Sequence, residues 1–255
     1  MHKREEDTLR NYIREESVRK IFAKVFDDHA VQAIHSLASK GLFDVVEFIV
    51  STGKEAHVFR ARDTSGNFRA VKIYKISTSD FRNMNKYIEG DERFKAIKRD
   101  KKSVVFAWTQ KEFKNLEVAV KAGVRVPMPA GFKDNVLVME FIGEKGVAAK
   151  TLKEVGLKNS LFTPEEAYEI FIEWMAKLYK ANLIHADLSE YNVLVNGEEL
   201  VLIDIGQAVL RSHPNAREFF ERDVKNVAIY FSKNGLEKSA EEVYADVKKA
   251  IGEKA

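Results

Sequence analysis

Three polar residues, Asp187, Asn192 and Asp204, lie where two short apolar runs begin or end, at 193–195 and 200–203. Mg²⁺ accepts a carboxylate and an amide oxygen as protein ligands, because it keeps several waters of its own. A second carboxylate that stays off the metal could orient a hydroxyl group and accept its proton. Residues of these types, presented by two paired strands, therefore suit phosphoryl transfer from a nucleoside triphosphate.

The spacing of these residues supports the same chemistry. Asp187 and Asn192 keep the interval of the H-R-D-x-x-x-x-N pattern of protein kinases, and the tripeptide beginning at Asp204 stands for D-F-G. Asn196-Gly197 between the apolar runs is a hairpin turn signal. The alternative, that all three are ordinary loop residues, weakens as further partners are found along the chain.

A lysine on an earlier strand is the first of these partners. Lys72 lies in a run that resembles the V-A-I-K strand, whose lysine pairs with the nucleotide phosphates. Kinases hold that lysine with a helical glutamate. The predicted helix at 104–122 offers Glu112 as the partner, with Glu117 as the alternative. A surface lysine on an edge strand is the competing interpretation.

The strands at 45–50 and 58–61 flank a glycine-bearing loop, the form that lays backbone N–H groups over phosphates. It is not a Walker A loop, because Phe48 replaces its first glycine and Glu55 its Ser or Thr. A plain hairpin is the alternative. The predicted nucleotide-binding residues here are Ser51, Thr52, Gly53, Lys54, Glu55, Ala56, His57 and Val58.

A buried strand at 135–143 runs into a glycine, as an interlobe hinge does. We expect backbone groups near Met139, Glu140 and Ile142 to contact the adenine. Further along the chain, Asp223 on a predicted helix is expected to brace the loop around Asp187 rather than to act in the reaction.

Helix signals frame these parts. Thr163, Pro164 and Glu166 form a capping box with proline at the first helical position. Apolar spacing predicts helices at 8–27 and 28–40, a helix opened by Pro214, and a last helix around 240–251. The segment from Val124 to Phe132 is expected to be an irregular edge.

Composition narrows the class. The chain has 255 residues, a formal net charge of +3 and no cysteine, so disulfides and thiolate metal sites are excluded. No apolar run approaches the roughly 20 residues needed to span a bilayer, and the N-terminus lacks the apolar core of a signal peptide. We therefore expect a cytoplasmic protein with no membrane contact.

One segment departs from this even charge. Residues 82–102 hold eight Lys or Arg and four acidic residues, with weak helix and strand signals. We predict a flexible basic insertion at about 77–103. It is either a solvated loop or a contact for RNA phosphates or a charged partner.

Taken together, the motifs S-T-G-K-E and H-A-D-L-S-E-Y-N make the chain resemble the RIO family of atypical serine/threonine protein kinases, above all its archaeal-type first subfamily. The resemblance implies an α+β, two-lobed protein-kinase-like fold without an activation loop or peptide-binding subdomain. It implies an N-terminal helical extension at 1–27, an N-lobe sheet with helices at 28–139 and a mainly helical C-lobe at 140–255. The residues that carry it are 51–56, 71–74, 185–192 and 202–204.

The resemblance also implies a function. It implies Mg-ATP (with Mn²⁺ as a substitute) and a role in maturation of the small ribosomal subunit, with autophosphorylation and an aspartyl-phosphate on Asp204. Ala186 replaces the arginine of H-R-D, and Gly206 stands where some relatives have serine. We expect a monomer that contacts the pre-ribosomal small subunit. The alternatives are a small-molecule kinase of the aminoglycoside or choline type, and a nucleotide-gated assembly factor with ATP hydrolysis as its release switch.

Overall fold

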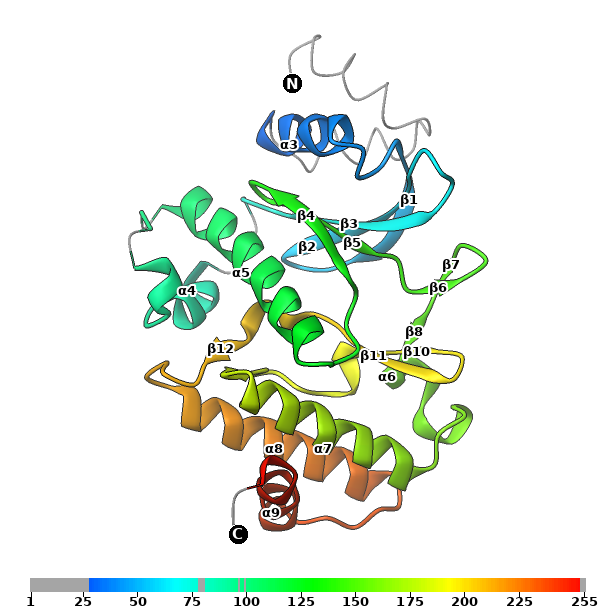
Figure 1. The fold of residues 1–255 in the computed structure, drawn as a ribbon, viewed down its shortest axis with the longest axis vertical. Helices are drawn as coiled ribbons and strands as arrows, with labels where there is room; N and C mark the ends of the chain where they lie inside the picture. Colours follow the sequence, from blue (N-terminus) through cyan, green and yellow to red (C-terminus); the bar gives the residue numbers. More distant parts are fainter. Residues whose placement is uncertain (1–27, 78–80, 96, 99, 253–255) are drawn as a thin grey trace. The chain divides into compact units, whose positions relative to one another are not determined.

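The computed structural model describes residues 28–77, 81–95, 97–98 and 100–252 (Figure 1). The helix predicted at 8–27 lies outside the described residues. The described chain divides into two compact units. Unit 1 holds 28–89, 94–114 and 128–141, and unit 2 holds 90–93, 115–127 and 142–252. No helix in the described part of the chain is long and apolar enough to cross a membrane.

Unit 1 is built on a five-stranded antiparallel sheet in the order β1-β2-β3-β5-β4. Pro129 begins the edge strand β4, a position that tolerates the missing N–H group. The segment expected to be an irregular edge therefore ends in a strand. The strands are β1 Val45–Thr52, β2 Ala56–Arg62, β3 Phe68–Tyr74, β4 Pro129–Lys133 and β5 Val136–Glu140.

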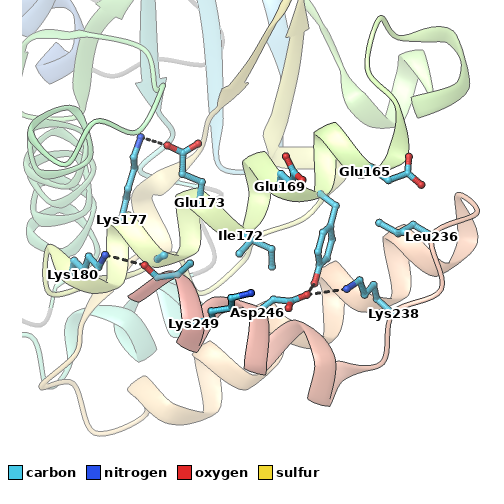
Figure 2. Close-up of a pocket in the computed structure, with 13 residues that line it drawn as sticks. Glu165, Glu169, Ile172, Glu173, Lys177, Lys180, Leu236, Lys238, Asp246 and Lys249 are labelled. Carbon is cyan, nitrogen blue, oxygen red and sulfur yellow. Dashed lines mark hydrogen bonds and ion pairs between the residues drawn. The ribbon is translucent and has the colours of Figure 1, made fainter. Parts of the chain in front are cut away.

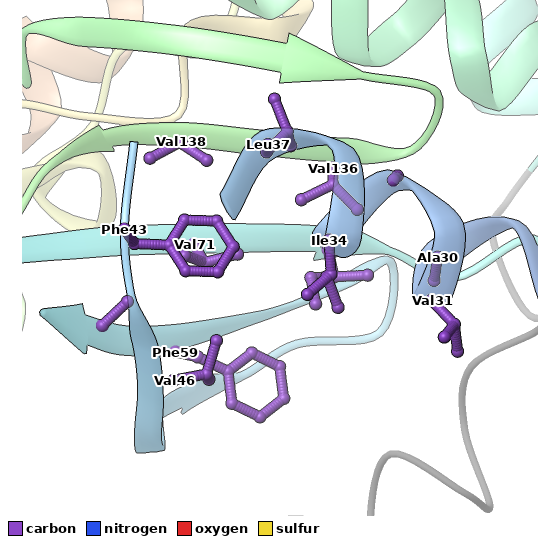
Figure 3. Close-up of a cluster of buried hydrophobic side chains, with 13 residues drawn as sticks. Ala30, Val31, Ile34, Leu37, Phe43, Val46, Phe59, Val71, Val136 and Val138 are labelled. Atoms are coloured by element: carbon purple, nitrogen blue, oxygen red, sulfur yellow. The ribbon is translucent and has the colours of Figure 1, made fainter. Parts of the chain in front are cut away.

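The core of unit 1 lies between helix α3 (Asp28–Ser39) and one face of this sheet. Alternate strand residues such as Phe59 and Val71 point to the helix, and Ile34 and Leu37 meet them from α3 (Figure 3). All four side chains are at most 1 % exposed. The side chains that alternate with these core residues lie on the opposite face of the sheet, which is available to polar residues.

The predicted basic insertion contains more regular structure than its composition suggested. Helix α4 (Phe81–Ile88) and the 3₁₀ turn η1 (Glu92–Phe94) lie within it, and α5 (Lys101–Lys121) begins before its end. Met84, Tyr87 and Ile88 are buried at helical spacing, which stabilises α4 despite the charged residues between them. The flexibility of the segment stays a prediction.

Unit 2 begins with short elements. The hairpin β10–β11 pairs Asn196 with Glu199, so the two loop residues are Gly197 and Glu198, one position later than the Asn-Gly signal suggested. Gly197 has φ 60°, which glycine adopts at little cost. The strands are β6 Gly143–Glu144, β7 Val147–Ala148, β8 Lys150–Thr151, β9 Leu183–Ile184, β10 Val193–Asn196, β11 Glu199–Leu202 and β12 Val209–Leu210.

Helices α7, α8 and α9 of unit 2 pack on one another, whereas the short helix α6 lies against β10 (Figure 1). The capping box of Thr163 and Glu166 and the proline at the helix start are confirmed at α7. Helix α8 begins at Ala216 after the N-cap Asn215, so Pro214 precedes the helix instead of opening it. The helices are α6 Leu152–Val155, α7 Pro164–Lys180, α8 Ala216–Lys233 and α9 Ala240–Ile251, with 3₁₀ turns η2 Leu157–Asn159, η3 Glu190–Asn192 and η4 Ile205–Gln207.

A groove of about 740 Å³ lies along α7 and α9 (Figure 2). Asp246 on α9 accepts hydrogen bonds from Tyr168 at 2.6 Å and from Lys238 at 2.9 Å. Lys180 donates to the Ala250 carbonyl at 2.9 Å. These contacts fasten α9 to α7, and none of the predicted site residues lines this groove.

Candidate active site

The hairpin of β10 and β11 brings Asn192 and Asp204 together. Asn192 directly precedes β10, and Asp204 follows β11 after one residue. Val193 pairs with Leu202, and the Ile203 N–H donates to the Asn192 carbonyl at 2.8 Å. The two residues predicted to hold a metal ion therefore start from neighbouring backbone positions at one end of the hairpin.

Asp187 lies against Asn192. The Asn192 Nδ2 donates to the Asp187 carbonyl oxygen at 2.8 Å and to Asp187 Oδ2 at 3.2 Å. Gln207 Nε2 donates to the same Oδ2 at 3.2 Å. Because these contacts use the nitrogen of the Asn192 amide, its oxygen is the atom suited to a cation.

Asp187 and Asp204 also interact electrostatically. Burial raises the pKa of Asp187, and the Asp204 carboxylate raises that pKa further. The hydrogen bond from Asn192 and the positive charge of Arg222 act in the opposite direction. A cation near Asp204 would lower the pKa of Asp187 and favour the charged form that a general base needs.

The backbone of Asp204 is left-handed, with φ 57° and ψ 53°. A non-glycine residue in this region carries strain on the order of 1–2 kcal/mol, and such strain persists only where the surroundings fix it. The residue is exposed, and the turn η4 follows it directly. An exposed acid in a strained conformation at the end of a buried strand is a candidate functional group.

Asp223 on α8 braces the loop before Asp187, as the sequence predicts. Its two oxygens accept from the backbone N–H groups of Ala186 at 2.7 Å and Leu188 at 2.8 Å. Arg222 donates to the Ala186 carbonyl, and Ala186 itself has φ 67°. Burial raises the pKa of Asp223 to about 7, although the two N–H groups and Arg222 lower it.

In unit 1, Lys72 forms an ion pair with Glu112, the first of the two predicted partners. Lys72 Nζ lies 2.8 Å from Glu112 Oε1, and the residues are 8 % and 1 % exposed. The Tyr74 hydroxyl donates to the other oxygen, Glu112 Oε2. Lys72 and Glu112 are 40 positions apart in the sequence, but a lysine on a strand and a glutamate on a helix predicted this contact.

The predicted phosphate loop is a tight hairpin between β1 and β2. The Gly53 N–H donates to the Ala56 carbonyl at 2.9 Å, and Lys75 Nζ donates to the Gly53 carbonyl at 2.7 Å. His57 is buried, and burial followed by the charge of Lys75 lowers its pKa. Its Nδ1 lies 3.3 Å from Thr52 Oγ1. The exposed part of the loop is Ser51, Thr52, Gly53 and Lys54, with Glu55, Ala56 and Val58 half-buried. Their role as phosphate ligands stays a prediction.

The predicted hinge residues lie where the chain leaves β5. Met139 and Glu140 end that strand, and the division between the units falls just before Ile142. The Glu140 N–H donates to Met128 O at 2.8 Å, and the Ile142 carbonyl accepts from Ala149 at 3.0 Å. Adenine contacts at these residues stay a prediction that would use their other backbone groups.

The donor set near Asp204 fits a nucleotide-borne Mg²⁺ ion. No group of three or more His, Cys, Asp or Glu side chains within the described residues could hold a metal ion by itself. Mg²⁺ commonly takes one or two carboxylates together with substrate phosphates and water. The Asp204 carboxylate and the Asn192 amide oxygen are donors of the kind this ion accepts.

Sequence reasoning missed several groups that complete these contacts. Gln207 reaches Asp187, Arg222 reaches Ala186, and the Asn226 amide donates to the Leu188 carbonyl at 3.2 Å. Gln207 and Arg222 lie close in sequence to residues that had been identified, and this proximity could have indicated them. Tyr74, two residues after Lys72, offered the same signal.

Comparisons with known proteins identify the family of the chain. A family model for the RIO domain matches residues 57–244. The chain is 46 % identical over 250 residues to the RIO-type serine/threonine-protein kinase Rio1 of Haloferax volcanii, covering 98 % of this chain and 85 % of that protein. It is 39 % identical to the Methanocaldococcus jannaschii protein of the same name, covering 87 % and 74 %.

A solved structure has the same fold at lower identity. The Rio2 kinase–ADP/Mg²⁺–phosphoaspartate complex of Chaetomium thermophilum is 22 % identical, with a TM-score of 0.65, and the match covers 89 % of this chain and 68 % of that one. The α+β protein-kinase-like fold is thereby confirmed. On the family match and the archaeal relatives together, the chain belongs to the RIO family of atypical serine/threonine protein kinases and is a phosphotransferase.

Proposed function

We propose that this kinase transfers the γ-phosphoryl group of Mg-ATP to serine or threonine hydroxyls, its own included, during maturation of the small ribosomal subunit. The observation that carries the chemical part is the contact of Asp187 with Asn192, beside the strained Asp204. It supplies a candidate base, an amide oxygen and a second carboxylate within one loop and hairpin. The ribosomal part rests on the family resemblance, and a cytoplasmic, monomeric protein is proposed with it.

Each group has one role in this proposal. Asp187 orients the acceptor hydroxyl and takes its proton, while Asn192 and Asp204 hold Mg²⁺, which offsets phosphate charge when bound. Lys72, kept in place by Glu112, neutralises further phosphate charge. The loop at 51–58 contributes N–H groups to the phosphates, and backbone groups at 139–142 contact the adenine.

A second route for the phosphoryl group runs through Asp204. In it, an Asp204 carboxylate oxygen bonds to the γ-phosphorus, the bond to the bridging oxygen breaks, and ADP leaves. Water then hydrolyses the acyl phosphate and releases inorganic phosphate. The Rio2 neighbour, described as a phosphoaspartate complex, supports this route, as does the exposed position of Asp204.

One observation favours a switch that uses ATP hydrolysis for release from a large particle. Five lysines of the basic segment are exposed: Lys86, Lys95, Lys98, Lys101 and Lys102. A cluster of lysines attracts the phosphates of RNA in a salt-dependent way. The proposed partner is the precursor of the small ribosomal subunit, bound through these side chains while the nucleotide is present.

The deciding experiment uses γ-labelled ATP with small-subunit precursors and follows the label. Label on serine or threonine supports the kinase reaction, and hydroxylamine-labile label lost in Asp204→Ala supports the aspartyl-phosphate. Free phosphate alone, stimulated by the precursors, supports the switch. No turnover in any arm, or wild-type turnover in Asp187→Ala, would reject the assignment. Sugars, choline and aminoglycosides as acceptors test the small-molecule alternative.

A further inference from the structure

Asn115 on α5 ties the loop that follows Asp204 to the body of unit 2. Its Nδ2 donates to the carbonyl oxygens of Ile205 and Ala208, at 2.9 Å in each case. Asn115 is fully buried. The two carbonyls lie at the beginning and just beyond the end of the turn η4, so one amide group holds the turn at both sides.

The direction of the Asn115 amide is fixed by a third partner. Arg93 Nη1 donates to Asn115 Oδ1 at 2.9 Å. Carbonyl oxygens can only accept and a guanidinium can only donate, so the nitrogen and oxygen of the amide have one consistent assignment. Arg93 therefore orients the amide that holds the turn.

Arg93 is itself held by Asp91. Arg93 Nη2 lies 2.6 Å from Asp91 Oδ2, Nε lies 2.9 Å from Asp91 Oδ1, and the Arg93 N–H donates to Oδ1 at 3.0 Å. Asp91 is 1 % exposed. A forked pair with a buried carboxylate has little freedom to reorient.

The segment that carries this pair is fastened a second time. Gly90 has φ +94°, and a Cβ atom at this position would lie 2.5 Å from Pro214 Cδ. The Gly90 backbone therefore packs directly on Pro214, which follows β12. Residues 90–93 thus contact the chain after Asp204 directly at Pro214, and reach η4 through Asn115.

We propose that Asp91, Arg93 and Asn115 form a positioning relay that fixes the turn after Asp204 and through it the direction of the Asp204 carboxylate. The left-handed backbone of Asp204 needs such support, because relaxation to the right-handed region would otherwise relieve its strain. The inference rests on the proposed function, in which Asp204 holds Mg²⁺. None of the three residues needs to touch the nucleotide.

The test is the Mg²⁺ dependence of turnover at saturating ATP in Asn115→Leu. Groups that orient metal ligands typically change metal affinity or activity by about 10–100-fold. We expect the Mg²⁺ concentration for half-maximal turnover to rise by about tenfold or more. Binding of a fluorescent ATP analogue in excess chelator should be unchanged. A merely structural role would lower the amount of folded enzyme without moving the Mg²⁺ response.

One further variant keeps the test decisive if Asn115→Leu folds poorly, and a double-variant cycle applies where it folds. Arg93→Lys keeps the charge but loses the fork, and should shift the Mg²⁺ response in the same direction by a smaller factor. In a double-variant cycle, Arg93→Leu should add almost nothing to Asn115→Leu. Thr109→Val is the matched control, since the Thr109 hydroxyl bonds only to the α5 backbone at Val105 among the contacts described.

The outcomes distinguish a failure of the proposed relay from a failure of the proposed function. Wild-type turnover in Asp204→Ala would reject the proposed function. An inactive Asp204→Ala together with a wild-type Mg²⁺ response in Asn115→Leu and Arg93→Lys would reject the relay alone. Full additivity of the Arg93 and Asn115 substitutions would also reject it, because independent effects do not pass through one amide.

Discussion

The two units treat their charged residues in opposite ways. In unit 1, Lys72 and Glu112 are buried as a pair of opposite charges, and the Tyr74 hydroxyl occupies the second glutamate oxygen. In unit 2, carboxylates gather around one short loop. Two of them, Asp187 and Asp223, have raised pKa values because the effect of burial is only partly offset by hydrogen bonds and by Arg222.

This difference indicates which unit has an unbalanced charge that a bound cation would neutralise. The opposite charges of the unit 1 pair neutralise each other, so the geometry of this pair is set by contacts within the protein. The unit 2 loop holds more negative than positive groups, and each additional carboxylate disfavours ionisation of its neighbours. A divalent cation would correct that imbalance, whereas the unit 1 pair needs none. Substitutions in each unit test this difference.

The largest effect is expected at Asp187. Asp187→Ala removes the proposed base and should lower turnover by about 10²–10⁴-fold, since general-base catalysis typically contributes that much. ATP binding should be retained. The measurement is steady-state turnover beside nucleotide titration. Asp246→Ala, which removes an acid of α9 that is bonded to Tyr168 and Lys238, is the control and should keep wild-type turnover.

The second-largest effect is expected at the ion pair of Lys72 and Glu112. Lys72→Met should abolish most turnover and weaken ATP binding, and should lower the free energy of unfolding by about 3 kcal/mol because Glu112 stays buried without its cation. The double variant Lys72→Met with Glu112→Leu should recover stability but not turnover. Thermal unfolding and turnover are measured together. Recovery of turnover in the double variant would show that the lysine charge is dispensable.

The third effect is a pH dependence of stability that arises in unit 2. Because burial raises the pKa of Asp223 to about 7, the folded protein binds a proton between about pH 4 and 7 that the unfolded chain has released. Stability from this group is therefore greatest at low pH and falls as pH rises, by at most about 1.4 kcal/mol per pH unit.

Asp223→Asn removes this titration. The variant loses one acceptor for the N–H groups of Ala186 and Leu188, so it should be less stable than wild type. Because only wild type gains stability from binding the proton, the difference should be largest at pH 5. The difference from wild type should shrink as pH rises to 8. Denaturant unfolding at three pH values measures it. A difference that grows with pH would mean that Asp223 is ionised throughout, with its two N–H groups outweighing burial.

The sequence predicted those features in which residue type and element agree. Apolar runs predicted β1, β2, β3 and β5, and a lysine on a strand with a glutamate on a helix predicted the Lys72–Glu112 pair. The brace by Asp223 followed from an acid on the helix after the loop. In each case the residue type and its predicted element were both visible in the single sequence.

Other features leave no such pattern. Asn115 bonds to carbonyls 90 and 93 residues away, and a side chain that meets backbone at that separation has no spacing signature. Helix α4 was overlooked because its few apolar residues lie among charges, although Met84, Tyr87 and Ile88 suffice once they are buried. Tertiary contacts outweigh local composition in both cases.

The smallest effect should come from Tyr74, which contacts the ion pair of unit 1. Tyr74→Phe removes the hydrogen bond to Glu112 Oε2 and leaves the ion pair with Lys72 in place. A hydrogen bond to a charged group contributes about 1.5 kcal/mol, so unfolding free energy should fall by about that amount while turnover changes less than about threefold.

The matched control for that variant is Tyr230→Phe. Among the described residues the buried Tyr230 hydroxyl has no hydrogen-bond partner, so its removal should leave stability unchanged or raise it slightly. Thermal unfolding of both variants measures the difference. If Tyr74→Phe instead lowered turnover as much as Lys72→Met, the pair would depend on the hydroxyl for its position. The two charges alone would then not fix the pair in unit 1, because the Tyr74 hydroxyl would also determine the position of Lys72.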